Sequence, residues 1–249
     1  ANRRRATLAL LSEVLAPGAR VLDMAAAQGN FSIALAELGY RVTWNDQRAE
    51  LEAYVRLKHR SGEIHYAPGN AYELRFDEPF DAVLITEVIE HVAHPDDFLR
   101  NAARLVRPGG YLIMTTPNGA YFRNKLPRFS DCADPAHYEA MQFKPDADGH
   151  IFLLHPDEVL TLAESAGLAI DRLDLFTNPL TNGHLKTARL LPLLPRSAVE
   201  AAERLSQRLP ARLARRLLVQ MGVRFRQGPA PPCADPMATD RRQDIEAMR

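Results

Sequence analysis

The sequence is poor in the features that mark several classes of protein. It has two cysteines, Cys132 and Cys233, and neither lies in the spacing of a metal knuckle or a redox pair. No uninterrupted apolar run reaches the roughly 18 residues that a membrane-spanning helix needs. The 31 basic and 31 acidic residues cancel, so no whole-chain field attracts nucleic acid. These absences favour a protein of a reduced, cytoplasmic compartment and argue against a nucleic-acid-binding protein.

The chain has 249 residues, of which 46% are hydrophobic, and this is enough apolar material for one sizeable core. The basic start at residues 3–5 is followed by an amphipathic stretch with Ser12 and Glu13, not by the apolar segment of a secretory signal. We therefore expect a single soluble domain with appendages. Its oligomeric state cannot be read from the sequence.

Short apolar strands and helical patterns alternate along most of the chain. Strands are predicted at 19–24, 41–44, 64–66, 81–85, 111–116 and 168–176, and helices at 7–15, 31–38, 48–59, 95–105 and 156–166. Strands separated by helices indicate crossover connections and a mostly parallel sheet with helices on both faces. The pattern predicts an α/β fold with a Rossmann-like, doubly wound sheet.

Two segments break this alternation. Residues 119–150 are rich in Pro, Asp, Asn and aromatics, which is typical of a lid over a substrate or of a surface loop that packs on the domain. This insertion carries Tyr121, Phe122, Phe129, Tyr138 and Phe143 beside Arg123, Lys125, Arg128 and Lys144.

The chain changes character after about residue 190. Residues 191–227 are rich in Leu and Arg and predict a basic amphipathic helical extension, and residues 228–249 predict a disordered tail. The part at 205–226 has two interpretations. It could lie on the inner face of a membrane as a peripheral contact, or it could pack on its own domain, residues 1–190.

The first signal of a site is the segment Val21–Ser32, which reads as a strand, a turn of small residues and a helix start. Small residues let the backbone approach a ligand, and free N–H groups at a helix start are good donors. Many α/β proteins without a ligand also pack a helix on a strand in this way. Asp46, at the end of the next predicted strand, strengthens the signal because a carboxylate there can accept both hydroxyls of a ribose.

Further motifs follow in a fixed order. They are the turn Gly69-Asn70-Ala71, the segment Phe80–His91, and the Arg-Pro-Gly-Gly turn that ends at Gly110 before the strand at 111–116. Over residues 7–177 the chain resembles the class I S-adenosylmethionine (SAM)-dependent methyltransferases. Within that family it resembles the ubiquinone-biosynthesis O-methyltransferases and the methyltransferases of polysaccharide gene clusters.

The resemblance implies the class I methyltransferase fold, SAM as the cofactor, and a set of cofactor-binding residues. That set is Asp23, Ala25, Ala27, Gly29, Asn30, Phe31, Asp46, Asn70, Ala71, Thr86 and Glu87. The chain departs from the family at Ala25 and Ala27, where glycine is usual, and at Asn70, where an acid is usual. An Ala methyl costs little at negative φ but is strained in a left-handed conformation. A nicotinamide dinucleotide is a poorer fit, because its pyrophosphate needs the missing glycines.

Two carboxylates and an imidazole follow the fourth predicted strand at Glu87, Glu90 and His91. Some relatives use a Glu-x-x-Glu-His motif to hold a divalent cation, and the small-RNA methyltransferases add a later His, for which His150 is the counterpart. The resemblance thus implies a Mg²⁺ site at Glu87, Glu90, His91 and His150. The alternative is that Glu87 faces the cofactor while Glu90 and His91 cap a helix or bind substrate. His91 is then the candidate catalytic base.

The predicted function is transfer of a methyl group from SAM to an oxygen, or less readily a nitrogen, of a small-molecule, lipid-linked or saccharide acceptor. An RNA-end 2′-O-methyltransferase is an alternative suggested by the four metal-binding candidates, but the neutral net charge argues against it. A non-catalytic, SAM-binding scaffold is a second alternative, and Ala25 and Ala27 are its support.

Overall fold

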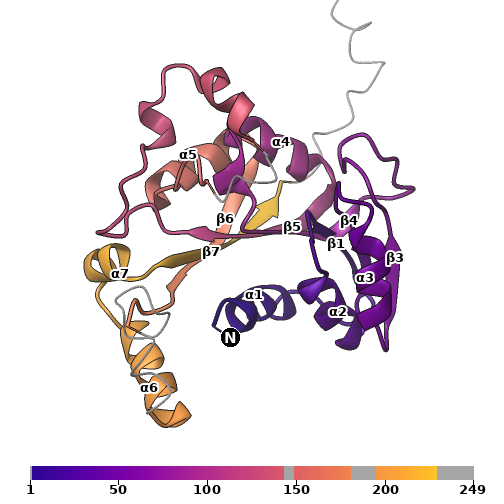
Figure 1. Ribbon diagram of the computed structural model, residues 1–249, viewed down its shortest axis with the longest axis horizontal. Coiled ribbons are helices and arrows are strands. Elements are labelled where there is room, and N and C mark those ends of the chain that lie inside the picture. The colour runs from indigo at the N-terminus through magenta and orange to yellow at the C-terminus, as the bar shows by residue number, and fades with distance from the viewer. Residues whose placement is uncertain (1, 143–148, 181–193, 229–249) are drawn as a thin grey trace, which may run out of the picture.

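The computed structural model describes residues 2–142, 149–180 and 194–228. In these residues seven strands form one sheet in the order β3-β2-β1-β4-β5-β7-β6 (Figure 1). The strands are β1 (Arg20–Met24), β2 (Arg41–Trp44), β3 (Glu63–Tyr66), β4 (Phe80–Thr86), β5 (Val106–Pro117), β6 (Leu168–Phe176) and β7 (Gln220–Gln227). Strand β7 runs antiparallel to both of its neighbours, β5 and β6, and the other paired strands are parallel. The predicted doubly wound, mostly parallel sheet is confirmed.

Helices cover both faces of the sheet. The α-helices are α1 (Asn2–Ser12), α2 (Asn30–Glu37), α3 (Leu51–Lys58), α4 (Pro95–Arg104), α5 (Pro156–Ser165), α6 (Arg196–Ser206) and α7 (Ala211–Leu217), and the short 3-10 turns are η1 (Ile89–His91), η2 (Phe129–Asp131) and η3 (Pro135–Met141). Figure 1 shows α1 and α2 on one side of the sheet and α4 and α5 on the other.

Strand β4 shows how the two faces are built. Ala82 and Leu84 pack into the apolar cluster under α1 and α2, whereas Val83 and Ile85 pack into the cluster under α4 and α5. Because both faces are buried, every residue of this stretch must be apolar, which explains the continuous hydrophobic run in the sequence.

The parallel register brings three segments to one edge of the sheet. Met24 at the end of β1 lies beside Ile85 of β4, and Asp23 lies beside Trp44 of β2. The residues that follow these strands, the turn at 25–29, Asn45-Asp46 and Thr86-Glu87, therefore emerge side by side. Doubly wound folds bind their ligands at this carboxyl edge.

The predicted helix over 205–226 is wrong in its second half. Helices α6 and α7 form, but Gln220–Gln227 is strand β7, which lies between β5 and β6. Met221, Val223 and Phe225 recur at every second position, which is the period of a strand, and all three are buried in the core. The leucines just before them recur at helical spacing. The sequence pattern therefore does not show clearly where the helical period ends and the period of two begins.

The predicted extension at 191–227 is therefore partly a component of the central sheet, and the buried residues of β7 cannot meet a membrane. None of the helices in the described part of the chain is both long and apolar enough to cross one. Of the predicted disordered tail at 228–249, residues 229–249 lie outside the described residues, as does the stretch 181–193.

Arg224 of β7 is buried and ion-paired, not part of a solvated basic face. Its Nε donates to Asp171 Oδ2 of β6 at 2.5 Å, and its Nη1 donates to the Leu10 carbonyl at 2.8 Å and to Glu13 Oε2 at 3.0 Å. The hydrogen bond from Arg224 is the largest contribution to the lowered pKa of Glu13. This guanidinium therefore fastens α1 to the antiparallel part of the sheet.

We predict that Arg224→Met lowers the free energy of unfolding by about 2–4 kcal/mol, because it leaves Asp171 and Glu13 without their buried partner. Arg226→Met, in the same strand but exposed, is the matched control and should change it by less than about 0.5 kcal/mol. Urea denaturation followed by circular dichroism measures both values. Equal losses in the two variants would contradict this role of Arg224.

Candidate functional site

The turn after β1 holds two alanines in the left-handed region. The φ angle is 53° at Ala25 and 47° at Ala27, and Gly29 follows at 66°. From the sequence alone, whether these alanines are strained depends on their φ angles. In the structure both lie in the left-handed region, where an L-residue is strained. The amide N–H groups of Ala26 and Ala27 donate to the Asn45 carbonyl and to Asp46 Oδ2, each at 2.8 Å. These bonds hold the turn against the end of β2.

Gly29 is required for packing as well as for its φ. A Cβ at this position would lie 2.6 Å from Val55 Cγ1 of α3. The predicted cofactor residue Gly29 thus lets α3 approach the turn closely, and it does not itself border the cavity described next.

A cavity of about 1230 Å³ lies against this turn. Six of the predicted cofactor-binding residues line it: Ala25, Ala27, Asn30, Phe31, Thr86 and Glu87. Arg3 and Arg4 of α1 line it too, which the sequence did not reveal. The volume is ample for a ligand the size of a nucleoside.

Asp23 and Asp46 lie behind the turn and do not line this cavity. Asp23 is buried, and its Oδ2 accepts from Ser32 Oγ at 2.5 Å while its Oδ1 has no hydrogen-bond partner among the described residues. Burial raises the pKa of Asp23 to about 7. Asp46 Oδ1 accepts from Arg48 N at 3.0 Å and Arg48 Nε at 2.9 Å, so its carboxylate is bonded within its own loop.

Asn70 and Ala71 also stand away from the cavity. The Asn70 side chain donates to Glu73 Oε1 at 2.8 Å and accepts from the Tyr72 amide at 3.1 Å, and Ala71 packs in the core under α4. In this structure the amide of Asn70 is used to form its own turn. Adenine recognition by Asn70 and Ala71 stays a prediction.

Glu87, directly after β4, joins three distant parts of the chain. Its φ is 56°, and its amide donates to the Thr115 carbonyl of β5 at 2.8 Å. Glu87 Oε2 lies 2.9 Å from Arg3 Nη1 of α1 and 3.3 Å from Gln220 Nε2 of β7. Its Oε1 is buried without a hydrogen-bond partner in the described part of the chain.

Sequence reasoning found Glu87 but neither of its partners. Gln220 was missed because β7 was interpreted as helix, and Arg3 because the basic start carries no local pattern of a site.

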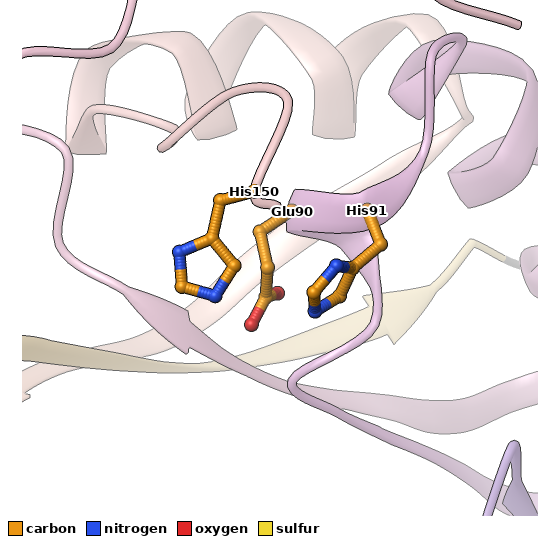
Figure 2. Close-up of side chains that lie close together, drawn as sticks. All are labelled: Glu90, His91 and His150. Carbon is orange, nitrogen blue, oxygen red and sulfur yellow. The ribbon is translucent and has the colours of Figure 1, made fainter. Parts of the chain in front are cut away.

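Glu90, His91 and His150 form a compact cluster. Their potential ligand atoms all lie within 4.8 Å of one another. In Figure 2 the three side chains point toward one another, with Glu90 and His91 coming from η1 and His150 from the end of the insertion. The Ile151 amide donates to the Glu90 carbonyl at 2.7 Å and holds the two segments together. The structure thus gathers three of the four predicted metal ligands, while Glu87 is paired with Arg3.

The Glu90 carboxyl group is buried in an unusual environment. Its Oε2 accepts from Thr116 Oγ1 at 3.0 Å, and its Oε1 has no hydrogen-bond partner among residues that the structure describes. Burial, and next the charge of Glu87, raises the pKa of Glu90 to about 8. Such a perturbed carboxyl at the ligand-binding edge of a sheet is typical of a functional site.

A second cavity, of about 550 Å³, lies beside the first. His150 lines it, together with residues of the loop 117–126 and of β7. His91, the predicted catalytic base, does not line it. Glu87, Thr177 and Gln220 line both cavities, so these three residues form the boundary between them.

The insertion makes contacts of two kinds, and its role as a lid stays a prediction. Phe129 and Tyr138 pack on Phe152, with ring centroids 5.4 Å and 5.1 Å away, as in a loop that simply covers the domain. Tyr121 and residues 123–126 instead line the smaller cavity. Phe143 and Lys144 lie outside the described residues.

Comparison with known proteins agrees with this architecture. Residues 1–173, more than half of the chain, match the family model described as a methyltransferase domain. The ubiquinone biosynthesis O-methyltransferase of Caulobacter sp. (strain K31) is 40% identical over 105 residues, which are 41% of this chain and 42% of that protein. The enzyme of the same name from Xanthomonas campestris pv. campestris (strain B100) is 39% identical over 111 residues, 43% of this chain and 46% of that protein. The matches thus span less than half the length of these curated relatives.

Solved structures share the fold at low identity. A SAM-dependent methyltransferase from Mesorhizobium loti matches with a TM-score of 0.59 and 18% identity, covering 90% of this chain and 96% of its own. The cyclase SpnF matches with a TM-score of 0.60 and 18% identity, covering 91% and 81%. The family match and the sheet order, with its antiparallel β7, lead to one assignment: the chain belongs to the methyltransferase-domain family and has the class I fold.

Proposed function

We propose that this methyltransferase binds SAM in the larger cavity and transfers its methyl group to a hydroxyl oxygen of an acceptor held in the smaller one. The observation that carries the proposal is the shared boundary, since Glu87, Thr177 and Gln220 line both cavities. A methyl group that leaves one cavity across this boundary enters the other directly. Positioning the two reactants in this way supplies much of the catalysis of such a transfer.

The residues around the larger cavity fit SAM. Bound SAM supplies the methyl group on a sulfonium, which is intrinsically reactive. Arg3 and Glu87 offer charges complementary to the carboxylate and ammonium of its methionine part. Asp46 can accept the ribose hydroxyls only if it gives up bonds to Arg48.

The acceptor side favours oxygen as the methylated atom. A hydroxyl must lose its proton during transfer, and His150 is an imidazole that lines the smaller cavity. The relatives named as O-methyltransferases support the same choice. His91 stands behind His150, with their ring centroids 5.0 Å apart, and orients it by packing.

The cluster of Glu90, His91 and His150 also fits a divalent cation. When bound, such a cation would lower the pKa of an acceptor hydroxyl. Two imidazoles and one carboxylate suit Mn²⁺, Fe²⁺ or Zn²⁺ better than the Mg²⁺ expected from the sequence, because Mg²⁺ prefers oxygen ligands. The buried Glu90 Oε1, without a partner among the described residues, is the atom that a cation would satisfy.

The cofactor assignment is tested by calorimetric titration with S-adenosylhomocysteine. We expect micromolar affinity for the wild type and a loss of tenfold or more in Asp46→Asn, since one charge-assisted hydrogen bond is worth about 1.5–3 kcal/mol. Glu50→Gln, an exposed carboxylate four positions along the same loop, is the control and should keep full affinity. A wild type that fails to bind S-adenosylhomocysteine would contradict the cofactor assignment.

The strained turn makes a prediction about stability. Ala27→Gly should raise the free energy of unfolding by about 0.5–1 kcal/mol, because relief of a left-handed Cβ exceeds the added entropy of the unfolded chain. Ala26→Gly, where φ is not positive, should lower it by about the same amount. Thermal melts of the two variants check the signs. If both variants lose stability alike, the turn is not strained at Ala27.

Mn²⁺ binding, followed by electron paramagnetic resonance, tests the cation site. The wild type should bind Mn²⁺ and Glu90→Gln should not, whereas Asp96→Asn, in a separate acidic cluster with His94 and Asp97, should bind as the wild type does. Because the pKa of Glu90 is raised to about 8, a proton competes for the site below that pH. Affinity should therefore rise from about pH 6 to pH 8. Binding that survives Glu90→Gln would place the cation elsewhere.

A further inference from the structure

Three polar side chains at the boundary between the two cavities form a chain of hydrogen bonds that runs in one direction. The Thr177 hydroxyl donates to Gln220 Oε1 at 3.1 Å, and Gln220 Nε2 donates to Glu87 Oε2 at 3.3 Å. An ionised carboxylate can only accept, so the Gln220 amide turns its NH₂ group toward Glu87 and its oxygen toward Thr177. A hydroxyl can donate to that oxygen, so each group in the chain faces a partner of the right kind.

The backbone is strained at both ends of this chain. The φ angle is 69° at Thr177, which directly follows β6, and 56° at Glu87. A positive φ is unfavourable for an L-residue, and more so for a β-branched one such as threonine. Strained conformations persist only where the surrounding structure holds them, and they cluster at functional sites. The fold therefore holds both residues in unfavourable conformations at the place where Gln220 joins them.

The two partners of the Glu87 carboxylate differ in their freedom to move. Gln220 is part of the sheet, where it pairs with Pro117 of β5 and with Phe176 of β6. Arg3 lies in the first turn of α1, and its side chain is 44% exposed. Helix ends fray, whereas a strand inside a sheet is held on both sides. A ligand can therefore displace Arg3 from Glu87, while Gln220 stays in place.

Glu87 Oε2 is the oxygen that a ligand can reach. The Glu87 side chain is 21% exposed, although its Oε1 is buried. Oε2 is also the oxygen that carries both Arg3 and Gln220. When the carboxylate of the methionine part of SAM pairs with Arg3, the ammonium can take the place of Arg3 at this oxygen. Gln220 is then the group that still fixes the Glu87 carboxylate.

We propose that Gln220 and Thr177 are positioning residues for the cofactor, which act through Glu87 and hold its carboxylate where the ammonium of the methionine part binds. This inference rests on the proposed function, which places SAM in the larger cavity. Gln220 acts on Glu87 directly, and Thr177 acts by fixing the direction of the Gln220 amide. Because all three residues also line the smaller cavity, they fix this part of the cofactor beside the place of methyl transfer.

The test compares two ligands that differ in the part bound by Glu87. S-adenosylhomocysteine carries the amino and carboxylate groups, whereas 5′-methylthioadenosine has the same nucleoside and sulfur without them. Calorimetry measures the affinity of each variant for both ligands. We expect Gln220→Met to weaken S-adenosylhomocysteine binding about tenfold, as for a lost hydrogen bond to a charged group, and to change 5′-methylthioadenosine binding by less than about twofold. A residue that only supported the fold would affect both ligands alike.

Thr177→Val tests the second step of the chain, because it keeps the β-branched shape and removes the hydroxyl. Alone, it should weaken S-adenosylhomocysteine binding about threefold. In the Gln220→Met background it should have no further effect, since the hydroxyl then has no amide to direct. Gln227→Met, at the other end of β7 and lining neither cavity, is the control and should bind both ligands as the wild type does.

The inference is overturned if Gln220→Met weakens both ligands equally or weakens neither. It is also overturned if the losses of Gln220→Met and Thr177→Val multiply in the double variant. This second comparison uses S-adenosylhomocysteine alone, so it decides the matter even when 5′-methylthioadenosine binds too weakly to measure. A wild type that fails to bind S-adenosylhomocysteine would instead overturn the proposed function.

Discussion

The ion pair between Glu87 and Arg3 is the interaction on which the architecture of the site depends. It ties the end of β4 to α1, while Gln220 brings β7 to the same carboxylate. These three elements come from the start, middle and end of the described chain, and they meet only because the doubly wound sheet places the end of β4 at its centre. The residue at the junction has a positive φ, a conformation that costs energy and is found mostly at functional sites.

Buried acids lie close to this junction. Asp23 stands behind the turn after β1, and Glu90 lies in the cluster next to the smaller cavity. Each has a carboxylate oxygen without a hydrogen-bond partner among the residues described, and burial raises the pKa of each. A buried polar atom without a partner destabilises a protein, so its persistence needs a reason. A metal ion at Glu90 is the partner that our proposals supply, whereas Asp23 lies behind the turn and outside both cavities.

The sequence predicts well those parts of the site that are local. The strand and turn around Ala25, the position of Asp46 at the end of β2, and the grouping of Glu90 with His91 depend on short segments whose periodicity is plain. The turn of small residues was identified correctly, but only the backbone angles show that Ala25 and Ala27 are strained. His150 was found through a resemblance, because nothing in its local sequence connects it to Glu90.

What the sequence could not reveal depends on contacts between distant segments. Gln220 joins the site because β7 returns between β5 and β6, and the alternating pattern at Met221, Val223 and Phe225 is hidden behind leucines with helical spacing. Arg3 belongs to the site because α1 crosses the face of the sheet and brings Arg3 to Glu87. Conversely, Asn70 matches the family motif in position, yet its side chain is taken up by its own turn.

A crystal structure of the protein with S-adenosylhomocysteine would test the central claim most directly, because that ligand keeps the sulfur from which the methyl group leaves. Our account predicts the ligand in the larger cavity, with its sulfur against Glu87, Thr177 and Gln220 and facing the smaller cavity. A ligand bound elsewhere, or one whose sulfur points away from that boundary, would contradict it.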